Sequence, residues 1–168
     1  MDTAPSQQPT SPLGASRFPL AFSAAWLLVL TLLSAACGSD VDEAGGRALW
    51  QRLHDEDYRS WRRAPGWETP KATIRPHGEL SEIFLNPTLD AARLSPSLDR
   101  WPEGSIIVKD SQSAGKPSIL AALEKTQGSW YYAEWDADGD VRYAGVPDVC
   151  THCHDAGQDQ VFSLGLPQ

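Results

Sequence analysis

The sequence predicts a single α+β domain that begins after an apolar N-terminal segment. Three observations support this fold class: apolar and aromatic residues at helical spacing over Arg47–Arg63, a β-branched run within Gly104–Asp110, and two strand-like runs on either side of Asp138-Gly139. The chain has 168 residues and a hydrophobic fraction of 41%, which suits one ordinary domain once the N-terminus is set aside.

The N-terminal segment has the organisation of an export signal. Residues 1–19 are rich in Ser, Pro, Gln and Thr, and Leu20–Leu33 is an almost unbroken apolar run that leads into Ser34-Ala35-Ala36-Cys37. Small residues directly before a cysteine resemble the bacterial lipoprotein signal, in which a peptidase cuts before the cysteine and the sulfur carries a diacylglycerol. We therefore expect a lipoprotein-type signal peptide over residues 1–36, lipidation at Cys37 and a lipidated tether over residues 37–46.

Two alternatives for this segment are an uncleaved transmembrane anchor and a cleaved signal whose cysteine is incidental. The apolar stretch Leu20–Ala36 has 17 residues, at the short limit for a membrane span of about 20. All three possibilities place the domain outside the cytoplasm. The favoured one predicts an exported lipoprotein, anchored in a membrane by its lipid and facing the periplasm or the cell exterior.

The first element of the domain is an amphipathic helix over Arg47–Arg63, in which Trp50 and Leu53 begin an apolar series at helical spacing. Glu79–Asn86 then alternates between apolar and polar residues, as a strand does. We expect a short helix over Thr88–Leu94, after the Asn-Pro pair that closes this strand.

The second half of the domain is predicted to be mainly strands. Gly104–Asp110 is the clearest of them, because β-branched residues fill its centre and turn residues bound it. Ile119–Lys125 is ambiguous, since its composition favours helix while its apolar residues alternate as in a strand. Ser129–Trp135 and Asp140–Ala144 flank Asp138-Gly139, which is a strong hairpin signal.

The five residues Cys150-Thr151-His152-Cys153-His154 match the attachment signature of a c-type haem. The spacing has a chemical reason: the two thiols bond the two vinyl groups of one porphyrin edge, and the next residue binds the iron. Cys150, Cys153 and His154 are therefore the predicted cofactor-binding residues, with His154 as the metal ligand, and the cofactor is one covalent haem c. His152 is not expected to reach the iron.

A redox dithiol and a zinc site are two other uses of a Cys-x-x-Cys motif. A redox dithiol normally follows a strand in a βαβ pattern, and a zinc site needs more Cys or His at a second suitable spacing. The sequence has neither context, and the one cysteine outside the motif is Cys37, far away near the N-terminus. Haem attachment is therefore favoured.

Several stretches together resemble the cytochrome P-460 family, which includes the cytochromes c prime beta. The resemblance covers residues 47–162 and implies a P-460-like haem c domain over residues 47–168. It implies a mainly antiparallel β-sheet with an N-terminal helix, a short helix at the haem motif and usually a homodimer, and it favours a strand over Ile119–Lys125. The stretches are, in chain order, Arg75-Pro76-His77-Gly78, Leu85-Asn86-Pro87, Trp101–Asp110, Leu120–Lys125, Ser129-Trp130-Tyr131-Tyr132, Cys150–His154 and Asp159-Gln160-Val161-Phe162.

The resemblance also assigns a role to Lys109. In the P-460 cytochromes a lysine from the strand that matches Ile106–Asp110 is bonded to the porphyrin edge, and Lys109 is the matching residue. Without the resemblance, Lys109 would be taken as a lysine that faces water on an edge strand. Its apolar neighbours Ile107 and Val108 suggest instead a buried strand and a position near the haem.

On the distal side of the haem the chain departs from the family pattern. The P-460 cytochromes tend to have an arginine where this chain has Ser81, and members active on hydroxylamine use a carboxylate shortly before the haem motif. The candidates for a catalytic carboxylate here are Glu79, Glu82 and Asp148, which would move protons.

The resemblance implies an oxidoreductase that binds and oxidises hydroxylamine or nitric oxide at an open iron site and passes electrons to a redox partner protein. The alternatives are a haem protein that binds nitric oxide without turnover, and an electron carrier with His/His or His/Lys ligation. Because Met1 is the only methionine, signal removal excludes the His/Met ligation common in electron-transfer cytochromes. The net charge of −8 argues against nucleic acid as a partner.

Overall fold

The computed structural model describes residues 41–73 and 76–164. The predicted signal peptide (residues 1–36) and the lipidation site Cys37 lie outside the described residues. The described residues all belong to one compact unit, in agreement with the predicted single domain. Within the described ranges, no helix is both long enough and apolar enough to cross a membrane.

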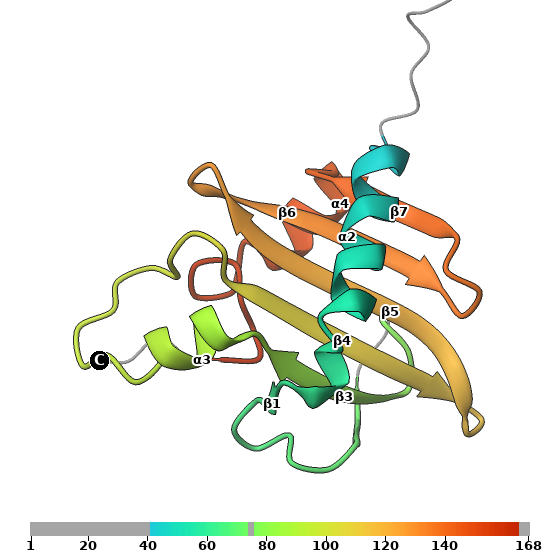
Figure 1. Cartoon of the computed structure of the whole chain (residues 1–168), viewed down its shortest axis with the longest axis horizontal. Coiled ribbons are helices and arrows are strands. Elements are labelled where there is room, and N and C mark those ends of the chain that lie inside the picture. The colour runs from blue at the N-terminus through green and yellow to red at the C-terminus, as the bar shows by residue number, and fades with distance from the viewer. Residues whose placement is uncertain (1–40, 74–75, 165–168) are drawn as a thin grey trace, which may run out of the picture. The chain divides into compact units, whose positions relative to one another are not determined.

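An antiparallel sheet forms the centre of the domain (Figure 1). Among the described residues it has seven strands in the order β1-β3-β4-β5-β6-β7, with β2 paired to β3, and every pairing is antiparallel. The predicted α+β fold with a mainly antiparallel sheet is confirmed, including a strand over Ile119–Lys125. The strands are β1 (Arg62–Arg63), β2 (Lys71–Ala72), β3 (Leu80–Leu85), β4 (Ile106–Ser113), β5 (Lys116–Thr126), β6 (Ser129–Asp136) and β7 (Val141–Gly145).

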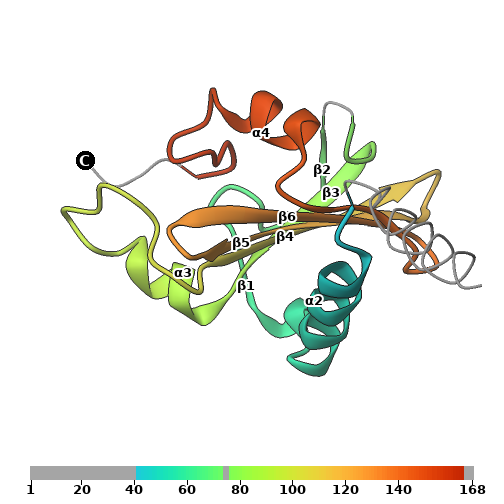
Figure 2. The ribbon, with the colours of Figure 1, turned by 90° about the horizontal axis from the view of Figure 1, so that it is seen from above.

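Helices cover both faces of this sheet. When the sheet is viewed edge-on, α2 lies on one side of it and α4 on the other (Figure 2). The short helices predicted after the Asn-Pro pair and at the Cys-x-x-Cys-His motif are both present. The helices in the described part are α2 (Glu43–Asp55), the single 3-10 turn η1 (Tyr58–Ser60), α3 (Pro87–Ala92) and α4 (Asp148–His154).

Helix α2 starts and ends earlier than the predicted range Arg47–Arg63. Asp42 caps its start, because the Asp42 side chain accepts a hydrogen bond from the backbone N–H of Gly45 at 2.9 Å. The first turn of the helix therefore replaces the end of the expected tether (residues 37–46). Asp57 ends the helical path, since its φ of 47° is left-handed and incompatible with continuation of the helix.

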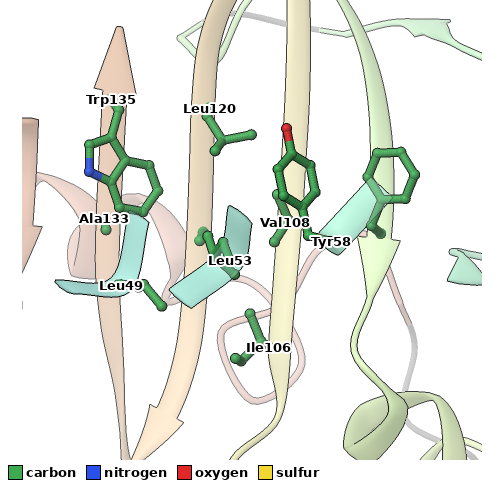
Figure 3. Close-up of a cluster of buried hydrophobic side chains, with 10 residues drawn as sticks. Leu49, Leu53, Tyr58, Ile106, Val108, Leu120, Ala133 and Trp135 are labelled. Carbon is green, nitrogen blue, oxygen red and sulfur yellow. The ribbon is translucent and has the colours of Figure 1, made fainter. Parts of the chain in front are cut away.

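The two faces of the sheet carry separate apolar clusters, because successive residues of a strand point to opposite faces. The first cluster lies between α2 and the sheet (Figure 3) and contains Leu49, Leu53, Tyr58, Phe84, Ile106, Val108, Leu120, Ala122, Ala133 and Trp135. The second lies on the face that α4 covers and contains Ala64, Ile83, Leu85, Leu89, Trp101, Ile107, Trp130, Tyr132, Val161 and Leu164. The chain after α4 thus contributes to the second cluster, which positions the Cys-x-x-Cys-His motif over the sheet.

Candidate functional site

A cavity of about 560 Å³ opens on the face of the sheet that α4 covers. This volume lies within the range of roughly 300–1,000 Å³ that is typical of ligand and cofactor sites. Most of its lining is apolar: Trp67, Ala72, Pro76, Ile83, Ile107, Ala121, Ala122, Leu123, Tyr132, Ala133, Val161 and Phe162. The polar lining residues are Thr73, His77, Lys109, Glu134, Cys150, Cys153, His154 and Ser163. An apolar wall with a few polar groups suits a large, mostly apolar ligand that those groups anchor.

The cavity brings the predicted haem-binding residues together. Cys150, Cys153 and His154 line it from α4, and Lys109 lines it from β4. Both cysteines are free thiols. On a helix, residues three apart are neighbours, so Cys150 and Cys153 lie on one side of α4. The four residues therefore converge as the motif and the family resemblance require.

His154 is oriented as a metal ligand would be. Its Nδ1 lies 2.8 Å from the backbone carbonyl oxygen of Gln160. A carbonyl can only accept, so Nδ1 carries the hydrogen and the lone pair of Nε2 is free. Metal-bound histidines almost always donate their second ring N–H in this way. Burial lowers the pKa of His154 against the opposing effect of the Gln160 bond, which favours the neutral imidazole that a metal needs.

The surroundings of Cys150 do not favour a reactive thiolate. Burial raises the pKa of its thiol to about 11, and the charge of Glu134 contributes to the same increase. Redox dithiols depend on the opposite effect, a lowered thiol pKa. The site therefore gives no support to the alternative of a redox dithiol.

Lys109 lies on a central strand, since β4 pairs with β3 on one side and β5 on the other. Its side chain is half-buried, and burial lowers the pKa of its amine against the opposing charge of Glu134. The alternative of a lysine that faces water on an edge strand does not hold. A larger uncharged fraction makes this amine a better nucleophile than an exposed lysine.

Glu134 is the buried carboxylate of the cavity, and sequence reasoning missed it. It is only 5% exposed. Its Oε2 lies 2.6 Å from Nδ1 of His77, and its Oε1 forms an ion pair with Arg142 Nη1 at 2.9 Å. Because the carboxylate accepts, Nδ1 of His77 carries the hydrogen and its Nε2 is the remaining polar atom of the ring. One signal was available: Glu134 shares a strand face with Tyr132 and so places a charge among apolar residues.

An irregularity in the sheet gives Glu134 its second partner. The pairing of β6 with β7 passes from Glu134↔Tyr143 to Trp135↔Val141, which leaves Arg142 without a ladder partner. Such a bulge re-aims a side chain, and bulges are common next to functional sites. Arg142 is thus available to pair with the buried carboxylate.

His77 faces the same region as the predicted iron ligand. The ring centroids of His77 and His154 are 6.3 Å apart, and both residues line the cavity. Tyr132 also contacts the His154 ring, at a centroid distance of 5.3 Å. His54 belongs to α2 on the opposite face of the sheet, and its Nδ1 lies 2.8 Å from Trp50 O, so it is not placed to serve as the second ligand of a His/His carrier.

The three carboxylates predicted to move protons do not line the cavity. Glu82 points to the α2 face, as the period-two alternation of β3 requires, and forms an ion pair with Arg63. Glu79 lies just before β3 and accepts a bond from Ser113 Oγ at 2.8 Å. Asp148 is the exposed first residue of α4. The prediction that these three carboxylates lie at the site is therefore corrected: the carboxylate that lines the cavity is Glu134.

Comparison with known proteins adds no identification to this geometry. A scan against models of protein families finds no match, and a search of curated proteins finds none either. The resemblance to the P-460 cytochromes stays a prediction from the motifs, and any functional conclusion depends on the cavity itself.

Proposed function

We propose that the protein is an exported, lipid-anchored cytochrome of the P-460 type that binds hydroxylamine or nitric oxide at the iron of one haem c. The observation that carries this proposal is the convergence of Cys150, Cys153, His154 and Lys109 on one apolar cavity. The residues fit the cofactor, since His154 has its Nε2 free and the cavity walls are apolar. When bound, the haem supplies an iron that can hold a small molecule and exchange electrons.

The chain's own residues account for attachment. The thiols of Cys150 and Cys153 would each add across a vinyl group, so that the sulfur bonds to one carbon and the thiol hydrogen passes to the other. This addition needs no oxidant. His154 would hold the iron, and Trp67, Ile107 and the other apolar residues of the wall would exclude water from the cofactor.

Lys109 would form a further bond at the porphyrin edge. A new nitrogen–carbon bond removes one hydrogen from the amine and one from the porphyrin carbon together with two electrons. It therefore requires an oxidant such as a peroxide during maturation. The half-buried position of Lys109 and its lowered pKa support this role, because the free amine is the reactive form.

Oxidation of hydroxylamine releases protons as well as electrons, so the site needs a proton acceptor. His77 and Glu134 are suited to this task, because they share a hydrogen bond of 2.6 Å on the cavity wall. Arg142 holds the other oxygen of the same carboxylate. The electrons pass to an external redox partner protein.

One observation favours a second candidate, an electron carrier with two histidine ligands. A metal-to-imidazole bond is about 2.0–2.1 Å and the ring centre lies roughly 1 Å beyond the nitrogen, so two imidazoles that would hold one metal can have centroids up to roughly 6 Å apart. The separation of 6.3 Å between His77 and His154 is close to this value. The bond from His77 to a carboxylate is also common for metal-bound histidine.

Two experiments test these candidates. The full chain is expressed in a host that attaches c-type haem, and its intact mass is compared with that of Cys150→Ala/Cys153→Ala. A covalent haem in the wild type alone supports the cofactor assignment, and a wild-type mass without added haem would reject it. The ferric spectrum is then recorded with and without nitric oxide, and hydroxylamine turnover is measured with an artificial electron acceptor.

The outcomes separate three functions. A high-spin spectrum that responds to nitric oxide, with turnover above that of free haem, supports the P-460 type of enzyme. The same spectrum without turnover indicates a protein that binds nitric oxide only, like the cytochromes c prime beta. A low-spin spectrum that ignores nitric oxide indicates the electron carrier.

A further inference from the structure

The turn that follows α4 has an unusual backbone. Asp159 and Gln160 have φ values of 45° and 63°, in the left-handed region that residues other than glycine seldom adopt. The turn is also closed tightly, because a Cβ on Gly157 would lie 2.8 Å from the backbone of Val161. Two successive left-handed residues persist only where surrounding contacts hold them.

A buried ion pair holds this turn against the sheet. Lys125, on β5, is only 5% exposed, and its Nζ lies 2.9 Å from Asp159 Oδ1 and 3.2 Å from Oδ2. The backbone N–H of Trp101 donates to Asp159 Oδ2 at 2.8 Å, and the indole N–H of Trp130 donates to the Asp159 carbonyl at 2.8 Å. Asp159 is therefore fixed through its side chain and its backbone together.

The residue after Asp159 provides the acceptor for the predicted iron ligand. The Gln160 carbonyl lies 2.8 Å from Nδ1 of His154. The Gln160 side chain is restrained as well, since Tyr132 donates its hydroxyl to Oε1 at 2.7 Å. The direction of this carbonyl depends on the left-handed turn, and the turn depends on the ion pair between Lys125 and Asp159.

Stability alone is a weak reason for such a pair. The free energy needed to remove two charges from water offsets much of their mutual attraction. A protein with a well-packed apolar pair in place of a buried ion pair is therefore often as stable. Lys125 also lies over the Trp130 ring, with Nζ 5.0 Å from the centroid, so an apolar side chain could pack there. The pair instead fixes the residue before Gln160, whose carbonyl contacts His154, and this suggests a role at His154.

We propose that Lys125 and Asp159 are positioning residues for the iron ligand: their ion pair holds the turn that aims the Gln160 carbonyl at His154, and so sets the reduction potential of the iron. This inference rests on the proposed function, in which His154 binds the iron of a haem c. A firmly held acceptor on Nδ1 makes the imidazole a stronger donor to the metal. A stronger donor favours ferric over ferrous iron and lowers the potential.

The test measures the midpoint potential of the haem-loaded full chain for Lys125→Met, Asp159→Asn and the double variant. Loosening the turn weakens the Gln160 acceptor in each of them, so all three potentials rise. If loss of this outer partner weakens binding of ferric iron about tenfold relative to ferrous iron, the potential rises by about 59 mV for a one-electron couple.

A simple effect of charge predicts a different pattern. Loss of the Lys125 cation alone would lower the potential, loss of the Asp159 anion alone would raise it, and the double variant would leave it unchanged. The double variant and the sign for Lys125→Met therefore decide the question. Opposite signs with an unchanged double variant would overturn the proposal.

Two further variants serve as controls for the charge variants. Arg52→Met/Glu124→Gln removes an ion pair on the α2 face of the sheet. Glu124 is next to Lys125 in sequence, and this double variant is expected to keep the wild-type potential. Tyr132→Phe keeps every charge and releases only the Gln160 side chain, so it raises the potential by less than Asp159→Asn does. If one of the charge variants does not fold, Tyr132→Phe provides the test in its place. A wild-type potential for Tyr132→Phe would then reject the proposal.

Failure of the proposed function is distinguishable from failure of this inference. If the wild type carries no covalent haem, or if His154→Ala leaves the iron ligation unchanged, the proposed function fails. If the wild type binds haem through His154 but the three potentials follow charge alone, only the positioning role of Lys125 and Asp159 fails.

Discussion

At the scale of single residues, hydrogen-bond acceptors determine the orientation of the two histidines that line the cavity. The backbone carbonyl of Gln160 can only accept a hydrogen bond from His154, and this determines which ring nitrogen is free for a metal. In the same way the carboxylate of Glu134 determines the tautomer of His77. Two oriented imidazoles thus line one cavity, and each is held by a group that can only accept a hydrogen bond.

The role of Glu134 is tested by Glu134→Gln, which keeps the size of the side chain and removes its charge. We expect hydroxylamine turnover to fall by about 10²-fold or more, since general acid–base groups contribute roughly 10²–10⁴-fold. Nitric oxide binding, which moves no proton, should change little. Steady-state kinetics and a nitric oxide titration measure the two effects.

The matched control is Glu82→Gln, because Glu82 is also a glutamate in an ion pair but points to the α2 face. Its turnover should equal that of the wild type. Equal losses in the two variants, or no loss in Glu134→Gln, would contradict the assignment.

Lys109 is tested by peptide mapping of the haem-loaded protein. In the wild type we expect haem on the peptide that contains Lys109 as well as on the peptide with the two cysteines. Lys109→Met should leave haem on the cysteine peptide only. Lys116→Met, at the exposed start of β5, serves as the control and should keep both attachments. Haem on the cysteine peptide alone in the wild type would show that Lys109 forms no bond.

At the scale of elements, α2 and α4 have separate tasks on opposite faces of the sheet. Helix α2 buries Leu49 and Leu53 against β4, β5 and β6, as Figure 3 shows, and contributes no residue to the cavity. Helix α4 has no buried residue of its own and instead supplies the motif. The sheet between them separates the first apolar cluster from the residues proposed to bind the cofactor.

This separation predicts the effect of Leu53→Ala. Leu53 is fully buried, so the substitution should reduce the free energy of unfolding by about 2–5 kcal/mol. The haem spectrum and the midpoint potential should not change, because the cavity is on the other face. Equilibrium unfolding in urea gives the first quantity. Leu94→Ala, at a position 69% exposed, is the control with little expected loss, and a spectral change in Leu53→Ala would argue against independent faces.

At the scale of the whole molecule, the domain has an apolar cavity of about 560 Å³ on one face of its sheet. A ligand that binds only the native state adds its binding free energy to stability. We therefore expect Cys150→Ala/Cys153→Ala to retain no haem and to melt at a lower temperature than the wild type. Thermal unfolding followed by circular dichroism measures the difference. An unchanged melting temperature with covalent haem still present would contradict the central role of the motif.

The lipid anchor predicts a change in the location of the whole molecule. Cys37→Ala, with signal removal confirmed by N-terminal sequencing, should release the protein from the membrane fraction while the haem stays attached. The reason is that Cys37 precedes the domain and carries the only proposed anchor. Fractionation with the wild type in parallel gives the result, and a processed variant that stayed with the membrane would refute lipidation.

Local patterns in the chain were enough to predict several elements of the fold. Strand β4, the hairpin at Asp138-Gly139 and the short helix α3 follow from β-branched runs and turn residues, and the structure has each of them. The motif Cys150–His154 and Lys109 were found in the same way, by spacing and by resemblance. These features could be predicted because the information lies within a few neighbouring residues.

Features that depend on distant residues became visible only in three dimensions. The range of α2 was wrong at both ends, because a cap at Asp42 and a left-handed Asp57 outweigh the apolar periodicity. The carboxylate that lines the cavity is Glu134, whose partner His77 comes from the turn before β3. Strand register and a bulge bring these two side chains together, and neither can be read from a local pattern, because pairing depends on the whole sheet.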